Sequence, residues 1–230
     1  IRAKTALEAV SFIESGEHVW CHSMAATPSL LLEALATHAM SCSDITLMQL
    51  HLEHAEAVTA PALDGHLRHR CFFAGKCTRA LINEGRADYV PIFLSEIPRL
   101  FRKGEQHIDT ALVQVSPPDR HGNCSLGISV EATRAACEVA DRIIAHINPA
   151  MPRTHGESFV NVRDIHVAFE SDEPLRCMPA GAPSEVEARI GAHVASLGED
   201  GACLQMGIGA IPDAALRCLG GHQDLGVHTE

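Results

Sequence analysis

The sequence has few positive charges for its length. Among 230 residues, Asp and Glu outnumber Lys and Arg by 29 to 18, which gives a formal net charge of −11. A nucleic acid or an anionic membrane surface would be repelled by such a chain, so neither is expected as a partner. Any anionic ligand has to be held locally, by helix termini and a small number of cations.

Long apolar runs and closely paired cysteines are missing as well. No hydrophobic stretch reaches the roughly 18 residues that a membrane-spanning helix needs, and residues 1–8 look like an amphipathic helix, not a signal peptide. The nine cysteines form no CxxC pair and several lie in apolar runs, which favours reduced, buried thiols over disulfides or a zinc site. We therefore expect a cytoplasmic protein.

What the sequence does contain is an alternation of apolar strands and amphipathic helices. Strands are expected at residues 17–22, 44–50, 87–93, 110–115, 142–147, 162–169, 202–206 and 224–227. Helices are expected at residues 3–13, 28–39 (with Thr27 as N-cap), 75–84, 95–102, 130–140, 184–196 (with Glu187 completing a capping box) and from about Pro212 to 219. This pattern predicts a doubly wound α/β fold with a mainly parallel sheet.

One segment interrupts the alternation. Residues 51–70 contain the pairs His51/His54 and His66/His69, whose spacing would place two rings on one helical face. A metal site would also need converging carboxylates or cysteines, and the fifteen histidines are scattered through the chain. We interpret the segment as a loop or hairpin insertion with solvated histidines, and we expect no bound metal.

The last quarter of the chain holds the most informative local pattern. An apolar run ending at Met206 leads into a turn of five residues, namely Gly207, Ile208, Gly209, Ala210 and Ile211. Pro212 then suits the first turn of a helix. A strand–glycine turn–helix unit presents free backbone N–H groups and the positive end of a helix dipole to an anion. The glycines do not complete a GxGxxG pattern, so a tight turn without a ligand is an open alternative.

The segment after this helix ends in a carboxylate. Residues 224–227 are expected to form a short strand that delivers Glu230 to its carboxyl end, the edge where ligands collect in open α/β sheets. A carboxylate there can act as a general base, or as a nucleophile that forms an anhydride with an acyl group. A solvated terminal glutamate is the alternative.

Two loops rich in Pro and Gly also follow expected strands. Residues 116–125 are either a rigid surface turn or a substrate loop, and the candidate contacts are Ser116, His121, Gly122 and Asn123. In the second loop, residues 148–156, Arg153 could neutralise a carboxylate or a phosphate, or it could be solvated.

Four long motifs resemble signatures of the acetyl-CoA hydrolase/transferase family, most closely those of the 4-hydroxybutyrate and butyrate:acetate CoA-transferases. They occur in the family's order at residues 83–96, 114–127, 148–156 and, as one motif in two segments, 205–214 with 224–230. The resemblance implies a CoA-transferase-like fold and ping-pong transfer of coenzyme A between acyl-CoA and short-chain carboxylic acids. It also implies that Gly207–Ile211 contacts coenzyme A and that Glu230 is the nucleophile, which carries a glutamyl-CoA thioester.

The resemblance has consequences for domains and partners. Family chains contain two α/β domains, so residues 1–230 are expected to be an amino-terminal CoA-transferase domain. A second domain would begin near residues 224–230, and the carboxy-terminal domain would lie outside this sequence. The isolated 230-residue fragment is then expected to be inactive. Coenzyme A is expected as a substrate, with no tightly bound cofactor, and the protein is expected to be a homo-oligomer. An acyl-CoA hydrolase and a non-catalytic CoA-binding or assembly domain are the alternatives.

Overall fold

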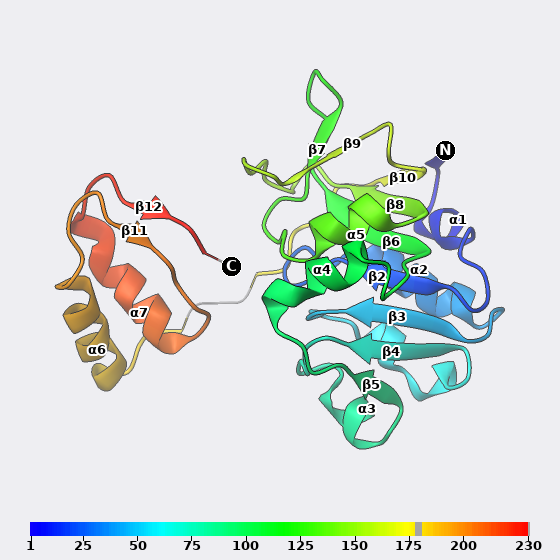
Figure 1. Cartoon of the computed structure of the whole chain (residues 1–230), viewed down its shortest axis with the longest axis horizontal. Coiled ribbons are helices and arrows are strands. Elements are labelled where there is room, and N and C mark those ends of the chain that lie inside the picture. Colours follow the sequence, from blue (N-terminus) through cyan, green and yellow to red (C-terminus); the bar gives the residue numbers. More distant parts are fainter. Residues whose placement is uncertain (178–180, 230) are drawn as a thin grey trace. The chain divides into compact units, whose positions relative to one another are not determined.

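Residues 1–177 and 181–229 are described by the computed structural model, and they belong to two compact units (Figure 1). Unit 1 comprises Ile1–Arg176 and unit 2 comprises Cys177–Glu230. Each unit is considered by itself. Of the helices in these described ranges, none has the length and apolar character required to cross a membrane.

Unit 1 is built on an eight-stranded sheet in which all neighbouring strands run parallel. In spatial order the strands are β1 (Arg2–Ala3), β10 (Val167–Glu170), β8 (Arg142–Ile147), β6 (Thr110–Val115), β2 (His18–Cys21), β3 (Ile45–Gln49), β4 (Leu67–Cys71) and β5 (Ala87–Tyr89). The chain builds from β2 outward to β5 and then returns to place β6 on the other side of β2. The strand order therefore reverses between β2 and β6, which is the switch point where this class of fold binds ligands.

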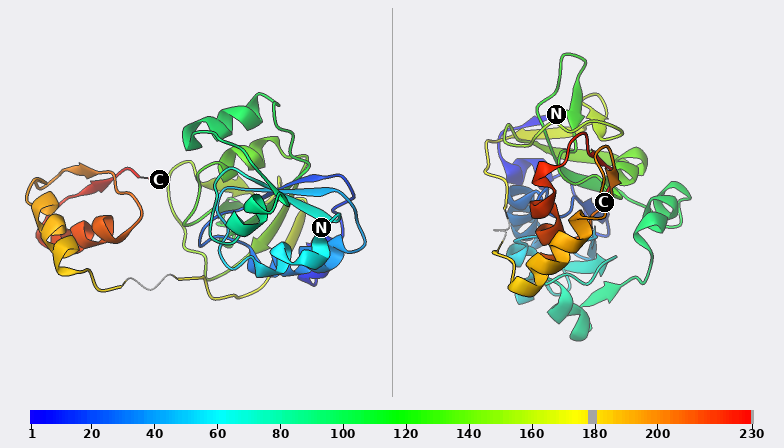
Figure 2. Two further views of the ribbon diagram at one scale, coloured as in Figure 1. Left: turned by 90° about the horizontal axis from the view of Figure 1, so that it is seen from below. Right: turned by 90° about the vertical axis from the view of Figure 1, so that its left-hand side faces the viewer.

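Helices cover both faces of this sheet (Figure 2). The α-helices of unit 1 are α1 (Ala6–Val10), α2 (Ser29–Ala39), α3 (Arg79–Asn83), α4 (Ile97–Arg102) and α5 (Thr133–Val139), with short 3-10 helices η1 (Glu56–Thr59), η2 (Pro61–Leu63) and η3 (Leu94–Glu96). Residues of α1 and α2 share one buried cluster with the sheet, and residues of α4 and α5 share another. The predicted doubly wound α/β fold with a parallel sheet is thus confirmed.

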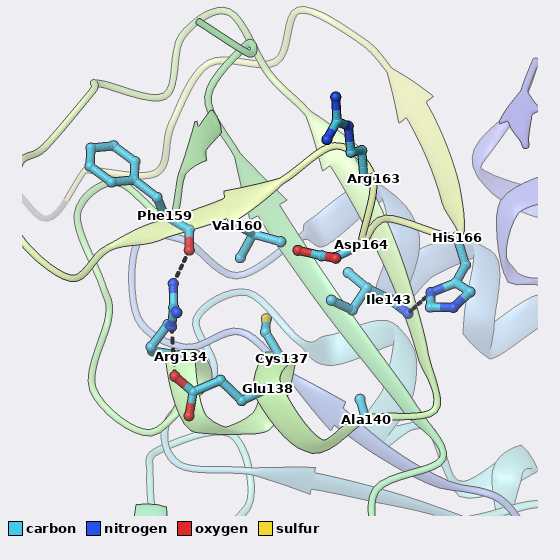
Figure 3. A pocket seen from close by; sticks show the side chains of 10 residues that line it. All are labelled: Arg134, Cys137, Glu138, Ala140, Ile143, Phe159, Val160, Arg163, Asp164 and His166. Atoms are coloured by element: carbon cyan, nitrogen blue, oxygen red, sulfur yellow. Dashed lines mark hydrogen bonds and ion pairs between the residues drawn. The ribbon is translucent and has the colours of Figure 1, made fainter. Parts of the chain in front are cut away.

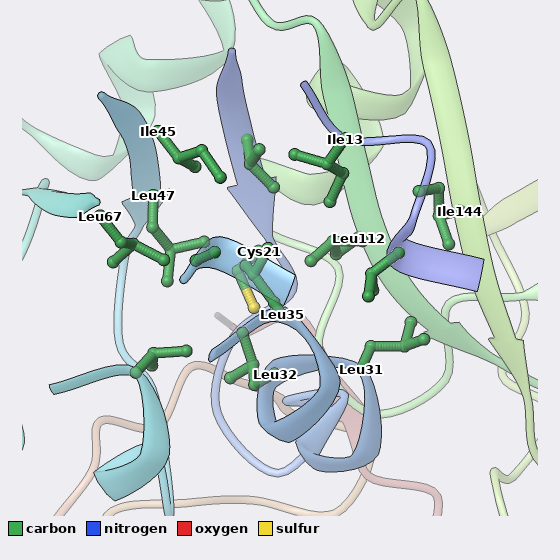
Figure 4. Packing of buried hydrophobic residues seen from close by; sticks show 14 of the residues in the cluster. Ile13, Cys21, Leu31, Leu32, Leu35, Ile45, Leu47, Leu67, Leu112 and Ile144 are labelled. Atoms are coloured by element: carbon green, nitrogen blue, oxygen red, sulfur yellow. The ribbon is translucent and has the colours of Figure 1, made fainter. Parts of the chain in front are cut away.

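Side chains alternate between the two cores along each strand. Cys21 points into the first core, where Leu32 and Leu35 of α2 pack against the sheet (Figure 4). The neighbouring Trp20 points into the second core and makes an edge-on contact with Phe101, with ring centroids 5.2 Å apart. Because both faces are covered, the central strands are predominantly apolar, as the sequence indicated, and polar residues within them such as Gln114 and His146 are buried.

The interpretation of residues 51–70 as a loop or hairpin insertion with solvated histidines was wrong in two respects, because the segment includes most of a strand of the main sheet and because His69 is buried. Residues Leu67–Cys71 form β4, which pairs with β3 over five residues. Along β4, the exposed Arg68 lies between the buried Leu67 and the buried His69. This strand of the main sheet therefore contains few apolar residues. His69 is in β4 and not in a helix, so His66 and His69 do not share a helical face. The Nε2 atom of His69 lies 2.9 Å from the carbonyl oxygen of Val58.

Other boundaries also differ from expectation. Of the strand expected at residues 162–169, only residues 167–169 are in a strand, which is β10. β9 (Phe159–Asn161) lies before this range and pairs antiparallel with β7 (Asn123–Ser125). Thr27 does not cap α2, because its hydroxyl donates to the carbonyl oxygen of Met24 at 2.6 Å and Pro28 holds the cap position.

Unit 2 contains two helices packed on a pair of short strands. Its elements are α6 (Glu185–Ala195), β11 (Cys203–Leu204), α7 (Ala210–Cys218), the 3-10 helix η4 (Leu219–Gly221) and β12 (Gly226–Val227). The capping box predicted at Ser184 is confirmed, since both hydrogen bonds with Glu187 are present. The strand expected at residues 202–206 is shorter than predicted and is not buried, because Cys203 is exposed.

Candidate functional site

The ends of the two strands in unit 2 bring the predicted site segments together. β11 and β12 pair in parallel, and the N–H of His228 donates to the carbonyl oxygen of Leu204 at 2.9 Å. The Thr229 hydroxyl donates to the carbonyl oxygen of Met206 at 2.6 Å and accepts from the Met206 N–H at 3.1 Å. The chain is thus fixed immediately before the glycine turn and immediately before Glu230, although Glu230 itself lies outside the described residues.

The glycine turn is exposed and leads directly into α7. Gly209 has a φ of +135°, a conformation that favours glycine, and α7 begins at the next residue, Ala210. The first N–H groups of a helix have no acceptor within the helix, so those of Ala210 and Ile211 are available to a ligand. Ile208 is 80% exposed at the tip of the turn. Asp213 adds a negative charge to the first helical turn, which opposes the binding of an anion there.

In unit 1, the carboxyl ends of β2, β6 and β8 are joined by buried polar side chains. The His22 ring accepts the Gln114 N–H at Nδ1 (3.3 Å), and its Nε2 lies 2.5 Å from the carbonyl oxygen of Ser129. The side-chain oxygen of Gln114 accepts from Asn148 Nδ2 at 2.7 Å. Burial lowers the pKa of His22, so the ring is neutral and its Nε2–H donates to Ser129. This network stiffens the switch point.

A strained residue lies beside this network. Met24 has a φ of +55°, which is uncommon for a residue other than glycine, and its N–H donates to the carbonyl oxygen of His51 at 2.8 Å. His51 Nε2 lies 2.9 Å from Glu53 Oε1, and the His51 ring packs against the half-exposed Phe73. Strain of this kind gathers at functional sites, so this corner of the sheet is a second candidate substrate contact.

The residues of the predicted substrate loop have different environments. Ser116 is buried, and its hydroxyl accepts the N–H of Ser125 at 2.9 Å, so it holds the base of the loop. His121 and Asn123 lie in the following turn, where the N–H groups of both donate to Asp119 Oδ1. The backbone hydrogen bond from Asn123 is the main reason why the pKa of Asp119 lies below its usual range.

Arg153 fastens the same turn from the neighbouring loop. Its guanidinium lies 2.7 Å from Asp119 Oδ2, donates to the carbonyl oxygen of Asn123 at 3.0 Å and stacks over the Phe159 ring at 4.5 Å. Gly122 adopts a φ of +82° within the turn. Arg153 thus already has a carboxylate partner, and a role of this loop toward a substrate stays a prediction.

The turn Gly207–Ile211 belongs to unit 2, whereas Ser116, His121, Gly122 and Asn123 belong to unit 1. The structure describes each set within its own unit. Met24 and Glu53 were not candidates from the sequence, because a positive φ and a contact between the segments that follow β2 and β3 leave no local pattern.

A surface depression of about 450 Å³ lies on another part of unit 1 (Figure 3). It is lined by residues of α5 and β9 together with Ile143 and His166, which are near the amino ends of β8 and β10. Two of its charged groups are engaged, since Arg134 donates to Glu138 at 2.9 Å and to the carbonyl oxygen of Phe159. Burial raises the pKa of the Cys137 thiol there to about 12, so this thiol is not a nucleophile at neutral pH.

The cysteines agree only in part with the expectation of buried thiols. Cys21, Cys71 and Cys124 are buried, and burial raises the pKa of Cys124 to about 11. Cys203 and Cys218 are exposed on unit 2.

Comparison with known proteins shows the family to which the chain belongs. The model of the acetyl-CoA hydrolase/transferase N-terminal domain matches residues 2–179. The chain belongs to the acetyl-CoA hydrolase/transferase family, as the four sequence motifs indicated.

Two curated relatives are similar to almost the whole chain. The chain is 46% identical over 226 residues to the succinyl-CoA:acetate/propanoyl-CoA:succinate CoA transferase of Fasciola hepatica, covering 97% of this chain and 47% of that protein. It is 41% identical to the 4-hydroxybutyrate coenzyme A transferase of Clostridium kluyveri, covering 98% of this chain and 53% of that protein. The chain therefore spans about half the length of these curated relatives.

Solved structures show the same fold. RipA from Yersinia pestis matches 100% of this chain and 56% of its own, with a TM-score of 0.89 and 33% identity. The 4-hydroxybutyrate CoA-transferase from Porphyromonas gingivalis matches 100% of this chain and 54% of its own, with a TM-score of 0.82 and 34% identity.

Proposed function

We propose that this chain is the amino-terminal half of an acyl-CoA:carboxylate CoA-transferase of the 4-hydroxybutyrate/butyrate/acetate type. The observation that carries the proposal is the similarity, at 41–46% identity over 97–98% of the chain, to relatives that are themselves CoA transferases. Because the chain spans about half of those relatives, we also propose that a carboxy-terminal domain follows it. Among the named relatives the transferases favour this function over an acyl-CoA hydrolase.

The proposed reaction runs in two halves through Glu230. Its carboxylate oxygen attacks the thioester carbonyl, the C–S bond breaks, and an acyl-glutamyl anhydride and CoA thiolate result. The thiolate then attacks the glutamyl carbonyl carbon, and the bond between this carbon and the bridging oxygen of the anhydride breaks. This releases the first carboxylate and leaves a glutamyl-CoA thioester. An acceptor carboxylate reverses both steps and departs as the new acyl-CoA, so atoms and charge balance.

The glycine turn is proposed to hold coenzyme A during this exchange. The free N–H groups at the start of α7 and the positive end of its dipole suit a phosphate or a developing oxyanion. The hydrogen bonds between Met206 and Thr229 support the proposal, because they fix the residue next to Glu230 beside the turn. Coenzyme A is in this scheme a substrate, and no tightly bound cofactor is required.

Two broader properties, the compartment and the oligomeric state, are also proposed. The buried thiols and the acidic composition suit a reducing compartment, which we infer to be the cytoplasm. We also infer a homo-oligomer, a proposal supported by exposed apolar residues such as Val186 and Leu197, which are 64% and 84% exposed. Sedimentation velocity of the full-length protein tests it, and a monomer would contradict it.

The test of function uses the full-length protein and its Glu230→Gln variant. After incubation with acyl-CoA without an acceptor acid, intact-protein mass spectrometry should show a CoA adduct that peptide mapping places on Glu230. The Gln variant should lose exchange of label between acyl-CoA and free acid, whereas loss of a general base would leave a rate lower by only about 10²–10⁴-fold.

The exposed Glu199 provides the matched control in the same unit, and Glu199→Gln should keep normal exchange. An adduct on another carboxylate, or near wild-type exchange by Glu230→Gln, would disprove the assignment. Turnover measured with and without acetate separates the transferase from a hydrolase, since a hydrolase consumes acyl-CoA at an undiminished rate without the acceptor.

A further inference from the structure

At the amino edge of the sheet, opposite the switch point, acidic and histidine side chains converge. His107 and Asp109 precede β6, and Asp141 precedes β8. His107 Nε2 lies 3.1 Å from Asp109 Oδ1 and 3.2 Å from Asp141 Oδ2. Among the side chains that the structure describes, this is the one such group whose ligand atoms all lie within 4.8 Å of one another.

These separations are those of atoms that share one small cation. Zinc binds imidazole nitrogen and carboxylate oxygen at about 2.0–2.1 Å, so two ligands on a tetrahedral ion lie about 3.3 Å apart. The two measured distances fall within 0.2 Å of that value. Binding would therefore require only small side-chain rotations, together with loss of a proton if His107 carries one.

Neighbouring groups hold the ligands in place and leave the carboxylates open to a cation. The His18 N–H donates to Asp109 Oδ2 at 2.7 Å, which fixes the carboxylate while its Oδ1 faces His107. Arg142, the residue after Asp141, is directed to Glu17 at 3.0 Å. A divalent ion would neutralise the two carboxylates of the cluster.

We propose that His107, Asp109 and Asp141 bind one zinc ion, with water at the fourth position. One imidazole and two carboxylates suit a transition metal better than Mg²⁺ or Ca²⁺, which prefer all-oxygen sites. His107 is 58% and Asp141 68% exposed, so the ion can enter from solvent and exchange. This site departs from the expectation of no metal, which considered only histidine pairs close in sequence.

A bound ion would tie the start of β6 to the start of β8 and so stabilise unit 1. Stabilisation grows with the logarithm of free zinc above the dissociation constant. At about 100-fold excess this corresponds to a rise in Tm of roughly 5–10 °C for a unit of this size. The proposal is independent of the function proposed above, because the cluster lies at the edge opposite the switch point.

The test compares the wild-type chain with Asp141→Asn and His107→Ala. In calorimetric titrations with zinc, the wild-type protein should bind one more equivalent than either variant, because the variants bind zinc at this site about 100-fold more weakly or worse. In thermal unfolding, zinc should raise the Tm of the wild-type protein more than that of either variant. Control His155→Ala removes an exposed histidine elsewhere and should behave as wild type. Mg²⁺ and Ca²⁺ should produce no shift.

Cobalt(II) bound in place of zinc provides a visible absorption spectrum that depends on the metal's ligands. A substitution that affected only the stability of unit 1 would not change this spectrum. Wild-type protein should gain visible d–d absorption assigned to nitrogen and oxygen ligands, and Asp141→Asn should lose it. A thiolate charge-transfer band would instead assign the ion to exposed cysteines such as Cys203. Equal zinc binding by wild type and both variants would overturn the proposal, because the cluster would then be only an ion pair.

Discussion

Gly191 lies where α6 packs closely against α7, the helix that follows the glycine turn. A Cβ added there would lie 2.6 Å from the carbonyl carbon of Ala214, 2.7 Å from its oxygen and 2.9 Å from the nitrogen of Ala215. All three are backbone atoms, so no side-chain rotation relieves the clash. To reach an ordinary contact of 3.4 Å, the helices must move apart by about 0.8 Å.

We therefore expect Gly191→Ala to destabilise unit 2. Overpacking of this kind costs about 1–3 kcal/mol, and the rigid backbone neighbours place it near the upper end. Alanine regains about 1 kcal/mol of helix propensity, which leaves a net loss of about 1–2 kcal/mol. Because unit 2 is small, its Tm should fall by roughly 5–15 °C.

Hydrogen exchange measured by mass spectrometry tests this expectation in the full chain. Amides of α6 and α7 should exchange faster in Gly191→Ala, while amides of the main sheet should be unchanged. Gly220→Ala is the control, since a Cβ there meets nothing within 4 Å. If Gly191→Ala instead slows exchange in these helices, the close packing of α6 on α7 would be refuted.

Three further outcomes are expected. Burial lowers the pKa of three histidines, namely His22, His69 and His146. Below about pH 6.5 the histidines of the unfolded chain take up protons, whereas the buried rings of the native protein stay neutral. The free energy of unfolding should therefore have its full value above about pH 6.5 and fall below it, by at most about 1.4 kcal/mol per pH unit for each histidine. Gly127→Ala should lower the Tm of unit 1 strongly, because its φ is +73° and a Cβ would lie 2.1 Å from Met151 Sδ. Gly209→Val should weaken binding of coenzyme A to the full-length protein, because valine disfavours the turn and crowds the ligand.

These three expected outcomes are checked by control variants or by results that would contradict them. Urea unfolding that gives equal free energies at pH 7.5 and pH 5.5 would exclude neutral buried histidines. Gly85→Ala has a similar φ of +74° and nothing within 4 Å, so it isolates backbone strain from the Met151 clash. Gly201→Val, at another open glycine of unit 2, is the control for Gly209→Val. Equal calorimetric affinities for coenzyme A in Gly209→Val and wild type would leave the turn with no ligand.

The fold could be predicted wherever local patterns are strong. The bounds of β6 and β8 match the expected strands at residues 110–115 and 142–147, because both are apolar runs flanked by turn residues. The capping box at Ser184 was equally readable. β4 was missed because Arg68, His69 and Arg70 obscure its apolar alternation, and only pairing with β3 makes this segment a strand.

The site was predictable only where it is local. A glycine turn between an apolar run and a helix is visible in the sequence, and its role toward coenzyme A stays a prediction. The switch-point network could not be predicted, because Gln114 is 92 residues from His22 and 34 residues from Asn148. Such polar side chains lie inside otherwise apolar segments and acquire a partner only when β2, β6 and β8 come together.

The excess of negative charge constrains how an anionic substrate can be held. With a net charge of −11, the chain repels a polyanion at long range, so binding must depend on contacts of short range. A helix dipole provides such a contact, since its effect falls off within the first turn. The start of α7 can therefore stabilise a phosphate or an oxyanion only if the neighbouring segments keep the anion close to the first turn of this helix. The paired hydrogen bonds between Met206 and Thr229 provide this constraint. If the proposed reaction is right, its rate should therefore depend more on the position of the turn relative to residue 230 than on the number of cations around the turn.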